Sequence, residues 1–322
     1  NGESVTIEWD GIRWAKRFIN NSTWTSSPRT AGEVVDVGDL IRVSRNSEDR
    51  WILSQVPDVN GAIVSINPNN GSIIALTGGY DFYQSNFNRV IQARRQPGSN
   101  FKPFLYAAAL DNGYTAASLI NDAPLNRSDY RPENFSGEFL GPISLKYALT
   151  NSKNLVSLRL YDALGDDVVI PYIERFGFNT AEFPRNDLTV AIGSHALTPM
   201  EVARAYTVFA NGGYQVEPYL IERIENFNDG NVYQAQPPLV CESCKADFGS
   251  ENQQPASLYL APLVIDEDVA YIMNNMLRSV ITNGSGRRIN REIGRSDLAG
   301  KTGTTNDNFD LWFSGFNADM VT

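Results

Sequence analysis

The sequence predicts an α+β fold, in which helices pack on an antiparallel sheet, preceded by a small all-β domain. Three observations lead to this class. Residues 1–57 contain short strand-like runs separated by turns, and residues 59–78 and 297–317 each contain two such runs around a polar turn. Several segments between those pairs have helical periodicity. Strands and helices thus come in runs, which favours an antiparallel sheet.

Length and composition indicate a globular protein of two domains. The chain has 322 residues, of which 42% are hydrophobic and 20% charged. We place the first domain at residues 1–57 and the second at 58–322. No apolar run approaches the roughly eighteen residues that a membrane span needs. The net charge of −10 argues against nucleic acid as a partner, since a phosphate backbone calls for a basic surface.

The strand pairs of both domains are predicted from their turn residues. In the first domain, VTIEW and IRWA flank Asp10-Gly11, and residues 34–57 repeat the strand–turn–strand pattern around Asn46-Ser47. In the second, GAIVSI and SIIALTGG enclose a turn at residues 67–71. Later pairs are expected around Asp229-Gly230 and Asn306-Asp307.

The helices are predicted from apolar periodicity and from their caps. One helix follows Ser99, and a pair of helices covers residues 144–165. Residues 198–212 begin with a Thr198–Glu201 capping box and end at Asn-Gly. Residues 269–281 carry a continuous apolar stripe, which predicts a helix packed on the core.

The two cysteines, Cys241 and Cys244, are spaced C-x-x-C within a polar, proline-containing stretch, residues 236–255. A redox motif should open a helix, and zinc would need two more ligands, whereas the single histidine, His195, is distant in sequence. A local disulfide in an oxidising compartment fits best, and two free thiols are the alternative.

The stretch RQPGSNFKPF, residues 95–104, places Ser99 three residues before Lys102, where a turn becomes a helix. Residues at i and i+3 share one helix face, so the Lys102 amine could reach the Ser99 hydroxyl. One interpretation is an N-capping serine followed by a lysine that extends its charge to solvent. The other is a nucleophilic serine whose lysine acts as a general base.

Two further motifs could complete such a site. Lys301-Thr302-Gly303 occurs once, on a predicted strand, where the glycine would let a substrate backbone approach. Its alternative is a solvent-facing strand end. Ser152-Lys153-Asn154 lies at the break between two helices, where its polar side chains can point into a cleft; a capped helix start is the alternative.

The order S-x-x-K, S-x-N, K-T-G is that of penicillin-binding proteins and serine β-lactamases. Residues 59–322 resemble the class A penicillin-binding proteins, most of all the 1a type of Gram-negative bacteria. The resemblance runs through RQPGSNFKPF, TNSKNLVS, ALTPMEVARAYTVFANGG, GRSDLAGKTGTTND and WFSGFN. It implies the penicillin-binding transpeptidase fold, an antiparallel sheet with helices on both faces. Residues 1–57 resemble the family's small OB-like domain.

The resemblance also implies that the chain is a piece of a longer protein. The family's glycosyltransferase domain and membrane anchor lie outside the sequence, and so do its last strand and terminal helix. We therefore expect an incomplete OB-like domain and a truncated C-terminal end. The expected location is the periplasmic face of the bacterial inner membrane, with membrane contact only through the anchor outside this chain.

The implied activity is that of a serine D,D-transpeptidase that crosslinks peptidoglycan stem peptides. Its partners would be a D-Ala-D-Ala donor, an amine acceptor and β-lactam antibiotics, with no cofactor or metal. The implied roles are nucleophile for Ser99, base for Lys102, and proton donor to the leaving amine for Ser152. Asn154 would hold both the substrate amide and Lys102, and Lys301 would be the neighbouring cation. The oxyanion would lie between the backbone N–H groups of Ser99 and Thr304. Lys301, Thr302 and Thr304 would receive the substrate carboxylate, on the strand that also carries Gly303.

Three other activities use related residues. A D,D-carboxypeptidase would use water as the acceptor, and a β-lactam sensor would acylate once and signal. A β-lactamase would need a deacylating base, for which Glu182 is the nearest candidate in the sequence.

Overall fold

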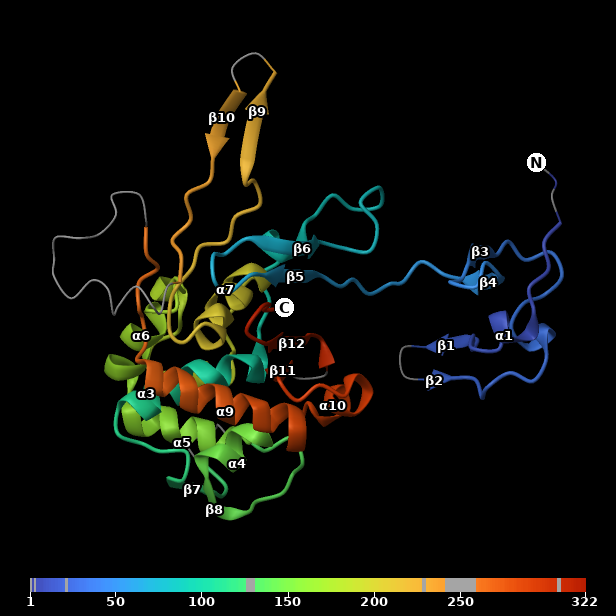
Figure 1. Ribbon diagram of the computed structural model, residues 1–322. Coiled ribbons are helices and arrows are strands. Elements are labelled where there is room, and N and C mark those ends of the chain that lie inside the picture. Colours follow the sequence, from blue (N-terminus) through green and yellow to red (C-terminus); the bar gives the residue numbers. More distant parts are fainter. Residues whose placement is uncertain are drawn as a thin grey trace. The chain divides into compact units, whose positions relative to one another are not determined.

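The computed structural model describes residues 2, 4–20, 23–125, 131–227, 230–240, 259–305 and 308–322 (Figure 1). The chain divides into two compact units, Asn1–Asn60 and Gly61–Thr322. Within the described ranges, none of the helices combines the length and apolar character required to span a bilayer.

The first unit is built from short elements. These are α1 (Trp9–Ile12), β1 (Phe18–Asn20), β2 (Thr23–Trp24), η1 (Ala31–Glu33), β3 (Arg42–Arg45) and β4 (Trp51–Ser54). The predicted β3–β4 pair is confirmed, and the Asn46 amide oxygen accepts the backbone N–H groups of Glu48 and Arg50 in its turn. Such a side-chain-to-backbone bond is the reason why asparagine favours turns.

The predicted turn at Asp10-Gly11 is wrong, because both residues lie inside helix α1. Gly11 and Ile12 are buried, and a Cβ atom on Gly11 would lie 3.0 Å from the Trp51 carbonyl oxygen. Ile12 joins Leu53 in a small apolar cluster. Packing against β4 therefore decides the local structure over the turn tendency of an Asp-Gly pair.

The second unit contains a central antiparallel sheet. Its strands are β5 (Ile63–Ile66), β6 (Ile73–Thr77), β11 (Ala299–Thr304) and β12 (Leu311–Phe316), paired as predicted. Val321 exchanges two backbone hydrogen bonds with Ile66, at 2.8 and 2.9 Å, and Thr322 exchanges two with Gly315, both 2.8 Å. Residues 321–322 thus join the two hairpins.

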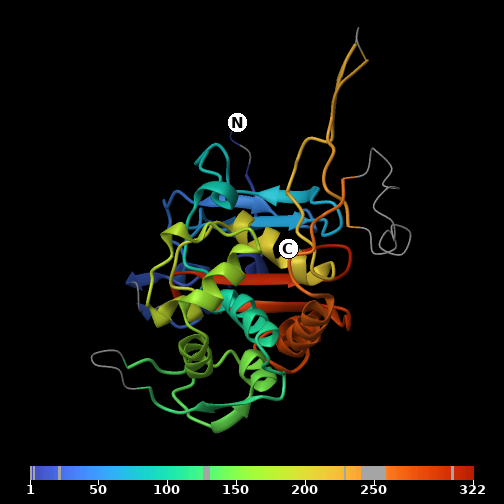
Figure 2. The same cartoon turned by 90° about the vertical axis from the view of Figure 1, so that its left-hand side faces the viewer.

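Two further strand pairs lie outside that sheet. They are β7 (Leu119–Asp122) with β8 (Gly141–Ser144), and β9 (Arg223–Asn226) with β10 (Gly230–Gln234). The second pair is the hairpin predicted around Asp229-Gly230. It projects from the helical body of this unit (Figure 2).

The helical segments of the second unit lie between residues 89 and 293. They are α2 (Arg89–Gln92), η2 (Gly98–Phe101), α3 (Lys102–Asp111), α4 (Leu145–Thr150), α5 (Asn154–Leu164), α6 (Asp166–Glu174), η3 (Thr180–Glu182), η4 (Leu188–Ile192), α7 (Pro199–Ala210), α9 (Glu267–Asn283) and α10 (Arg287–Ile293). Every residue of α3 from 102 to 110 is buried. Helices α4, α5, α6 and α9 contact it, α7 packs on β5 and β12, and α9 packs on β11.

The cap and stripe predicted for two helices are confirmed. Thr198 and Glu201 form the capping box of α7. On α9, the apolar stripe from Val269 to Ile281 is buried in the core, with Ile272 partly covered. The α+β class predicted from the sequence is therefore confirmed for the second unit.

Candidate active site

Ser99 lies in η2, one turn before α3 begins. The preceding Gly98 has a φ of +55°, and a Cβ atom there would lie 2.8 Å from the Thr304 carbonyl oxygen. The Gly98 N–H donates to the Gly193 carbonyl at 3.1 Å. Only glycine fits this left-handed, close-packed position, so the sequence Pro-Gly-Ser fixes Ser99 beside strand β11.

The capping interpretation of Ser99 is wrong. The N-cap residue of α3 is Phe101, and η2 has no side-chain cap. Across the described ranges, the Ser99 hydroxyl makes no hydrogen bond to a side chain or to the backbone. Ser99 is half-buried, and its hydroxyl is available to a ligand.

Lys102 is fully buried, which excludes a lysine that extends its charge to solvent. Its Nζ donates to the Ser152 carbonyl oxygen at 2.8 Å and to Asn154 Oδ1 at 2.7 Å. Ser152 Oγ is 3.5 Å from the same Nζ. The lysine of the first motif is thus held by the second motif, 50 residues later.

Lys301 is also fully buried, so the K-T-G motif is not a solvent-facing strand end. Its Nζ donates to Ser152 Oγ at 2.8 Å and to the Thr302 carbonyl at 3.0 Å. Ser152 therefore lies between the two lysines, and the three predicted motifs meet at its hydroxyl.

Ser152 has a φ of +57°, in the left-handed region that side chains other than glycine seldom adopt. It lies in the turn between α4 and α5, and its backbone N–H donates to the Leu149 carbonyl at 3.1 Å. The turn points both its hydroxyl and its carbonyl at Lys102. Such conformations concentrate at functional sites, where the surrounding fold holds them.

Burial changes the protonation of both lysines. It lowers the pKa of Lys102 well below the ordinary 10.5, and the nearby Lys301 charge lowers it further. Burial alone lowers the pKa of Lys301 to about 7. A neutral lysine has two N–H donors and one lone pair. The two shorter bonds, to the Ser152 carbonyl and Asn154 Oδ1, can take both N–H groups of a neutral Lys102. Its lone pair is then left to accept a proton from a hydroxyl, and the third contact of its Nζ is the Ser152 hydroxyl at 3.5 Å.

Gly303 has a different neighbour from the one expected from the sequence. A Cβ atom at this position would lie 2.3 Å from the Pro97 carbonyl oxygen and 2.8 Å from the Asn100 Cβ. Gly303 is buried and lets β11 lie directly against η2, so the close approach is made by the protein's own backbone. The neighbouring Thr302 and Thr304 side chains face the open cleft instead.

A cleft of about 900 Å³ runs between these elements. Its lining includes Ser99, Ser152, Asn154, Thr302 and Thr304 from the predicted set. Lys102 and Lys301 lie buried beneath it. The structure therefore brings all the predicted catalytic residues together at one cleft.

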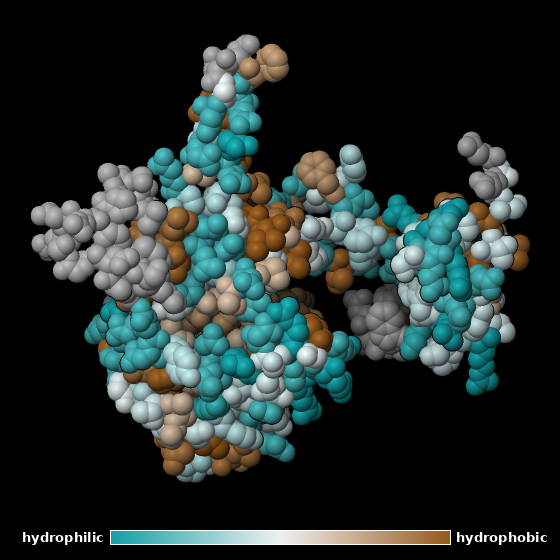
Figure 3. All heavy atoms as spheres, viewed as in Figure 1, coloured by the Kyte–Doolittle hydropathy of each residue, from teal (hydrophilic) through white to brown (hydrophobic). Residues whose placement is uncertain are grey.

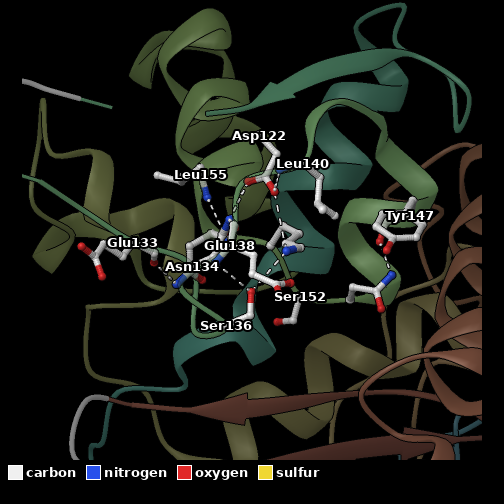
Figure 4. Close-up of polar contacts among 12 residues, drawn as sticks. Asp122, Glu133, Asn134, Ser136, Glu138, Leu140, Tyr147, Ser152 and Leu155 are labelled. Carbon is white, nitrogen blue, oxygen red and sulfur yellow. Dashed lines mark hydrogen bonds and ion pairs between the residues drawn. The ribbon is translucent and has the colours of Figure 1, made fainter. Parts of the chain in front are cut away.

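Several lining residues were missed from the sequence, among them Ser285, Glu133 and Asn134. The Ser285 hydroxyl is 2.7 Å from that of Thr302. The only sequence signal was the Asn-Gly-Ser-Gly stop after α9, where Gly284 allows close contact with the Thr150 carbonyl. Glu133 and Asn134 come from a loop rich in Asn, Asp and Pro, which had no recognisable motif. In Figure 4, the Glu133 carboxylate points away from Ser152.

His195 and Glu182, which were also considered from the sequence, do not line the cleft. Both ring nitrogens of His195 are buried without a hydrogen-bond partner in the described structure, and its ring packs on Phe101 and Phe183 at 4.2 and 3.8 Å. Burial lowers its pKa to about 3, so it is a neutral packing residue. Glu182 pairs with Arg94 at 3.1 Å and does not line the cleft. Cys241 and Cys244 fall outside the described residues.

Ser99 lies in a turn that faces the cleft, and the Ser152 hydroxyl lies between the buried Lys102 and Lys301. This is the geometry of the serine–lysine class of acyl-transfer sites. Comparisons with known proteins identify the family. Residues 61–316 match the penicillin binding protein transpeptidase domain, and residues 1–59 match the penicillin-binding protein OB-like domain. The chain belongs to the penicillin-binding protein transpeptidase family.

Relatives of known name agree with this assignment. Penicillin-binding protein 1A of Pseudomonas aeruginosa is 45% identical over 100% of this chain and 43% of its own length. The Escherichia coli protein of the same name is 38% identical, over 100% of this chain and 44% of its own. The chain thus spans less than half the length of these relatives.

A solved structure has the same fold. Penicillin-binding protein 1A from Haemophilus influenzae superposes with a TM-score of 0.81 at 35% identity, over 90% of this chain and 46% of that one. The D,D-transpeptidase domain of a peptidoglycan glycosyltransferase from Eggerthella lenta gives a TM-score of 0.65 at 23% identity, over 81% and 72%. The predicted fold and family are confirmed.

Proposed function

We propose that this chain is a serine D,D-transpeptidase, which crosslinks peptidoglycan stem peptides through an acyl-enzyme on Ser99. The observation that supports it most is the hydrogen bonding of Lys102: its two shorter bonds, to the Ser152 carbonyl and Asn154 Oδ1, account for both N–H groups of the neutral amine and leave its lone pair for a hydroxyl proton. Burial, and then the Lys301 charge, lower the pKa of Lys102 well below its ordinary value, which favours the neutral form that a general base requires.

In the first step, Ser99 Oγ attacks the carbonyl carbon of the D-Ala–D-Ala bond while Lys102 takes the hydroxyl proton. The tetrahedral intermediate then collapses, the C–N bond breaks, and the leaving amine takes up a proton. Ser152 Oγ, 3.5 Å from Lys102 Nζ, passes that proton from Lys102 to the leaving D-Ala. The products are the acyl-enzyme and free D-Ala.

The developing oxyanion lies between the backbone N–H groups of Ser99 and Thr304. Close contact between Gly98 and the Thr304 carbonyl supports this placement, because it brings the two backbones side by side. Removal of one oxyanion donor typically costs about 100- to 1000-fold in rate. The Thr302, Thr304 and Ser285 side chains line the cleft, and together with the charge of Lys301 buried beneath them they would receive the terminal carboxylate of the donor.

In the second step, the amine of another stem peptide attacks the acyl-enzyme carbonyl and gives a proton to Lys102. The ester C–O bond to Ser99 then breaks, and Lys102 returns that proton to Ser99 Oγ, which restores the hydroxyl. Water in place of that amine would give a D,D-carboxypeptidase. The β-lactamase alternative is disfavoured, since Glu182 is paired with Arg94 outside the cleft. A sensor would stop at the acyl-enzyme.

We further infer that β-lactams acylate Ser99, because they mimic the D-Ala–D-Ala bond. Solved structures of penicillin-binding protein A from M. tuberculosis include penicillin G and imipenem acyl-enzyme complexes, although at 20–21% identity they share only the fold with this chain. The proposed location is the periplasmic face of the inner membrane, and the proposed domain boundary lies at residues 57–58. We expect no cofactor.

The test is intact-protein mass spectrometry after incubation with benzylpenicillin, followed over hours. We expect one penicilloyl adduct, mapped to the tryptic peptide that contains Ser99, which persists for many minutes. An adduct on another serine would overturn the assignment, and catalytic release of hydrolysed penicillin would indicate a β-lactamase. Incubation with a donor pentapeptide and an added amine then separates transpeptidation from simple hydrolysis of the donor. Acylation of Ser99 with neither the crosslinked nor the hydrolysed peptide as product would indicate a β-lactam sensor.

A further inference from the structure

A buried polar network lies under the Ser152-Lys153-Asn154 turn (Figure 4). Its centre is Asn134, which is 4% exposed and comes from the loop between β7 and β8. The Asn134 Oδ1 atom accepts the backbone N–H groups of Asn154 at 2.9 Å and Leu155 at 3.4 Å. Since α5 has no side-chain cap of its own, Asn134 caps it from 20 residues away.

Asp122 holds Asn134 in that orientation. Asn134 Nδ2 donates to Asp122 Oδ1 at 2.6 Å and to the Glu138 carbonyl at 2.9 Å. The Asp122 side chain is fully buried, and its other oxygen lies 3.6 Å from Lys153 Nζ. One buried carboxylate thus holds both the capping residue and the middle residue of the S-x-N motif.

The same loop also orients the Asn154 side chain. Asn154 Nδ2 donates to the Glu133 carbonyl at 3.0 Å, while Oδ1 accepts from Lys102. Backbone carbonyls only accept and backbone N–H groups only donate, so these contacts leave one orientation for each amide. An inverted Asn154 would present N–H to Lys102, which would occupy the lone pair needed for proton transfer.

We propose that Asp122 and Asn134 are positioning residues, which hold the Asn154 carbonyl toward Lys102 and so keep the lysine lone pair free for Ser99. Neither residue touches Lys102 or Ser99 by a hydrogen bond. Their effect passes through the backbone of Asn154 and the adjacent Glu133 carbonyl. This inference rests on the proposed function of Ser99 and Lys102.

The test is a double-mutant cycle on β-lactam acylation, with the saturating acylation rate and the half-saturating concentration measured separately. We expect Asn134→Ala to lower the saturating rate at least tenfold, with less than threefold change in the half-saturating benzylpenicillin concentration. In an Asn154→Ala background, the same substitution should change the rate less than twofold, because its effect acts through that side chain.

Asn211→Ala is the matched control. Like Asn134, Asn211 is a buried asparagine whose amide donates two hydrogen bonds and accepts a backbone N–H, but it follows α7 and does not line the cleft. We expect it to lower the melting temperature as much as Asn134→Ala does but to leave the saturating rate within twofold.

Two results would overturn the positioning role: an equal loss of rate in both backgrounds, or a loss confined to the half-saturating concentration. Should Asn134→Ala not fold, Asn134→Ser, which keeps a hydroxyl for Asp122, enters the same cycle with the same criterion. If wild type forms no adduct, the proposed function fails. If wild type acylates and the cycle is additive, only the positioning inference fails.

Discussion

Two antiparallel hairpins of the second unit, β9–β10 and β11–β12, have similar local structure and opposite surroundings. Every residue of β9 and β10 is exposed, and the space-filling view shows this hairpin standing in solvent with polar and apolar side chains on its surface (Figure 3). In β11, residues 299–301 and 303 are buried, since α9 and η2 pack on the strand. Strand pairing alone therefore suffices to form the exposed β9–β10 hairpin. In β11, packing of α9 and η2 on the strand buries the residues that contribute to the candidate active site.

Charge on the two hairpins behaves accordingly. Arg223 on β9 pairs with Glu225 at 3.1 Å with both side chains exposed, which contributes about 0–1 kcal/mol. Lys301 on β11 has no carboxylate partner in the described structure and is fully buried. Burial without a counter-charge lowers its pKa, and its charge in turn lowers the pKa of Lys102. Burial of the β11–β12 hairpin therefore lowers the pKa of the proposed base, Lys102. The exposed β9–β10 hairpin cannot change a pKa in this way.

The largest effect is expected from Lys102→Arg. Arginine keeps a cation on a long stem, but its pKa stays above roughly 12, so it cannot accept the Ser99 proton. The variant should fold and lose acylation by several orders of magnitude, as measured by the second-order rate with penicillin beside a thermal melt. Acylation within about tenfold of wild type, a loss of only ~1.4 kcal/mol, would end the general-base assignment.

The next comparison is between glycine-to-alanine substitutions on the two hairpins, Gly303→Ala on β11 and Gly230→Ala on β10. Gly303→Ala should lower stability by about 1–3 kcal/mol and acylation at least tenfold, because the Pro97 carbonyl occupies the added atom's place. Gly230→Ala, where nothing lies within 4 Å, should show only the roughly 1–2 kcal/mol cost of its φ of +71°. Its acylation rate should equal that of wild type. Denaturant unfolding and acylation kinetics measure both, and equal rate losses would contradict the packing argument.

Stability should rise with pH because of the buried lysine. Lys301 has a pKa of about 7 when folded and 10.5 as its ordinary value, so between these pH values the unfolded chain binds more protons. The free energy of unfolding should then increase by up to about 1.4 kcal/mol per pH unit from this group. Lys301→Gln should flatten that slope in denaturant titrations from pH 7 to 10. An unchanged slope would show that the Lys301 amine is hydrated in the folded protein and that burial does not lower its pKa.

The smallest effect is expected on the exposed hairpin. Ile224 on β9 is 47% exposed, so Ile224→Thr removes little buried apolar surface. The expected change in unfolding free energy is within about 0.5 kcal/mol, with no change in acylation. A larger loss of acylation would mean that β9–β10 contributes to the site.

The sequence predicted the parts of the site whose chemistry is local. Ser99, Lys102 and Lys301 stood out because serine and lysine at i and i+3, and a lysine on a glycine-containing strand, have a mechanism attached to their spacing. Their burial could not be predicted, since it depends on α9 and η2 packing over them. The alternative interpretations, a Lys102 that extends its charge to solvent and a solvent-facing strand end at Lys301, were wrong for that reason.

Other features needed contacts between distant residues. Asn134 and Ser285 have no local signal, because their roles come from hydrogen bonds to residues 20 and 17 positions away. Gly303 was assigned to substrate approach, although it is the protein's own η2 that lies against it. The Asp10-Gly11 turn failed because burial of Ile12 favours a helix there.

The central claim, that the fold keeps Lys102 neutral as a base, is tested most directly by NMR titration of the lysine side chains. The chain has six lysines, so the ¹⁵Nζ or ¹³Cε signals can be assigned by single substitutions. We predict that Lys102 titrates well below 10.5 and that its pKa rises in Lys301→Gln, because the neighbouring charge is gone. A Lys102 signal that titrates near roughly 10.4 in wild type, and does not move in that variant, would contradict the account.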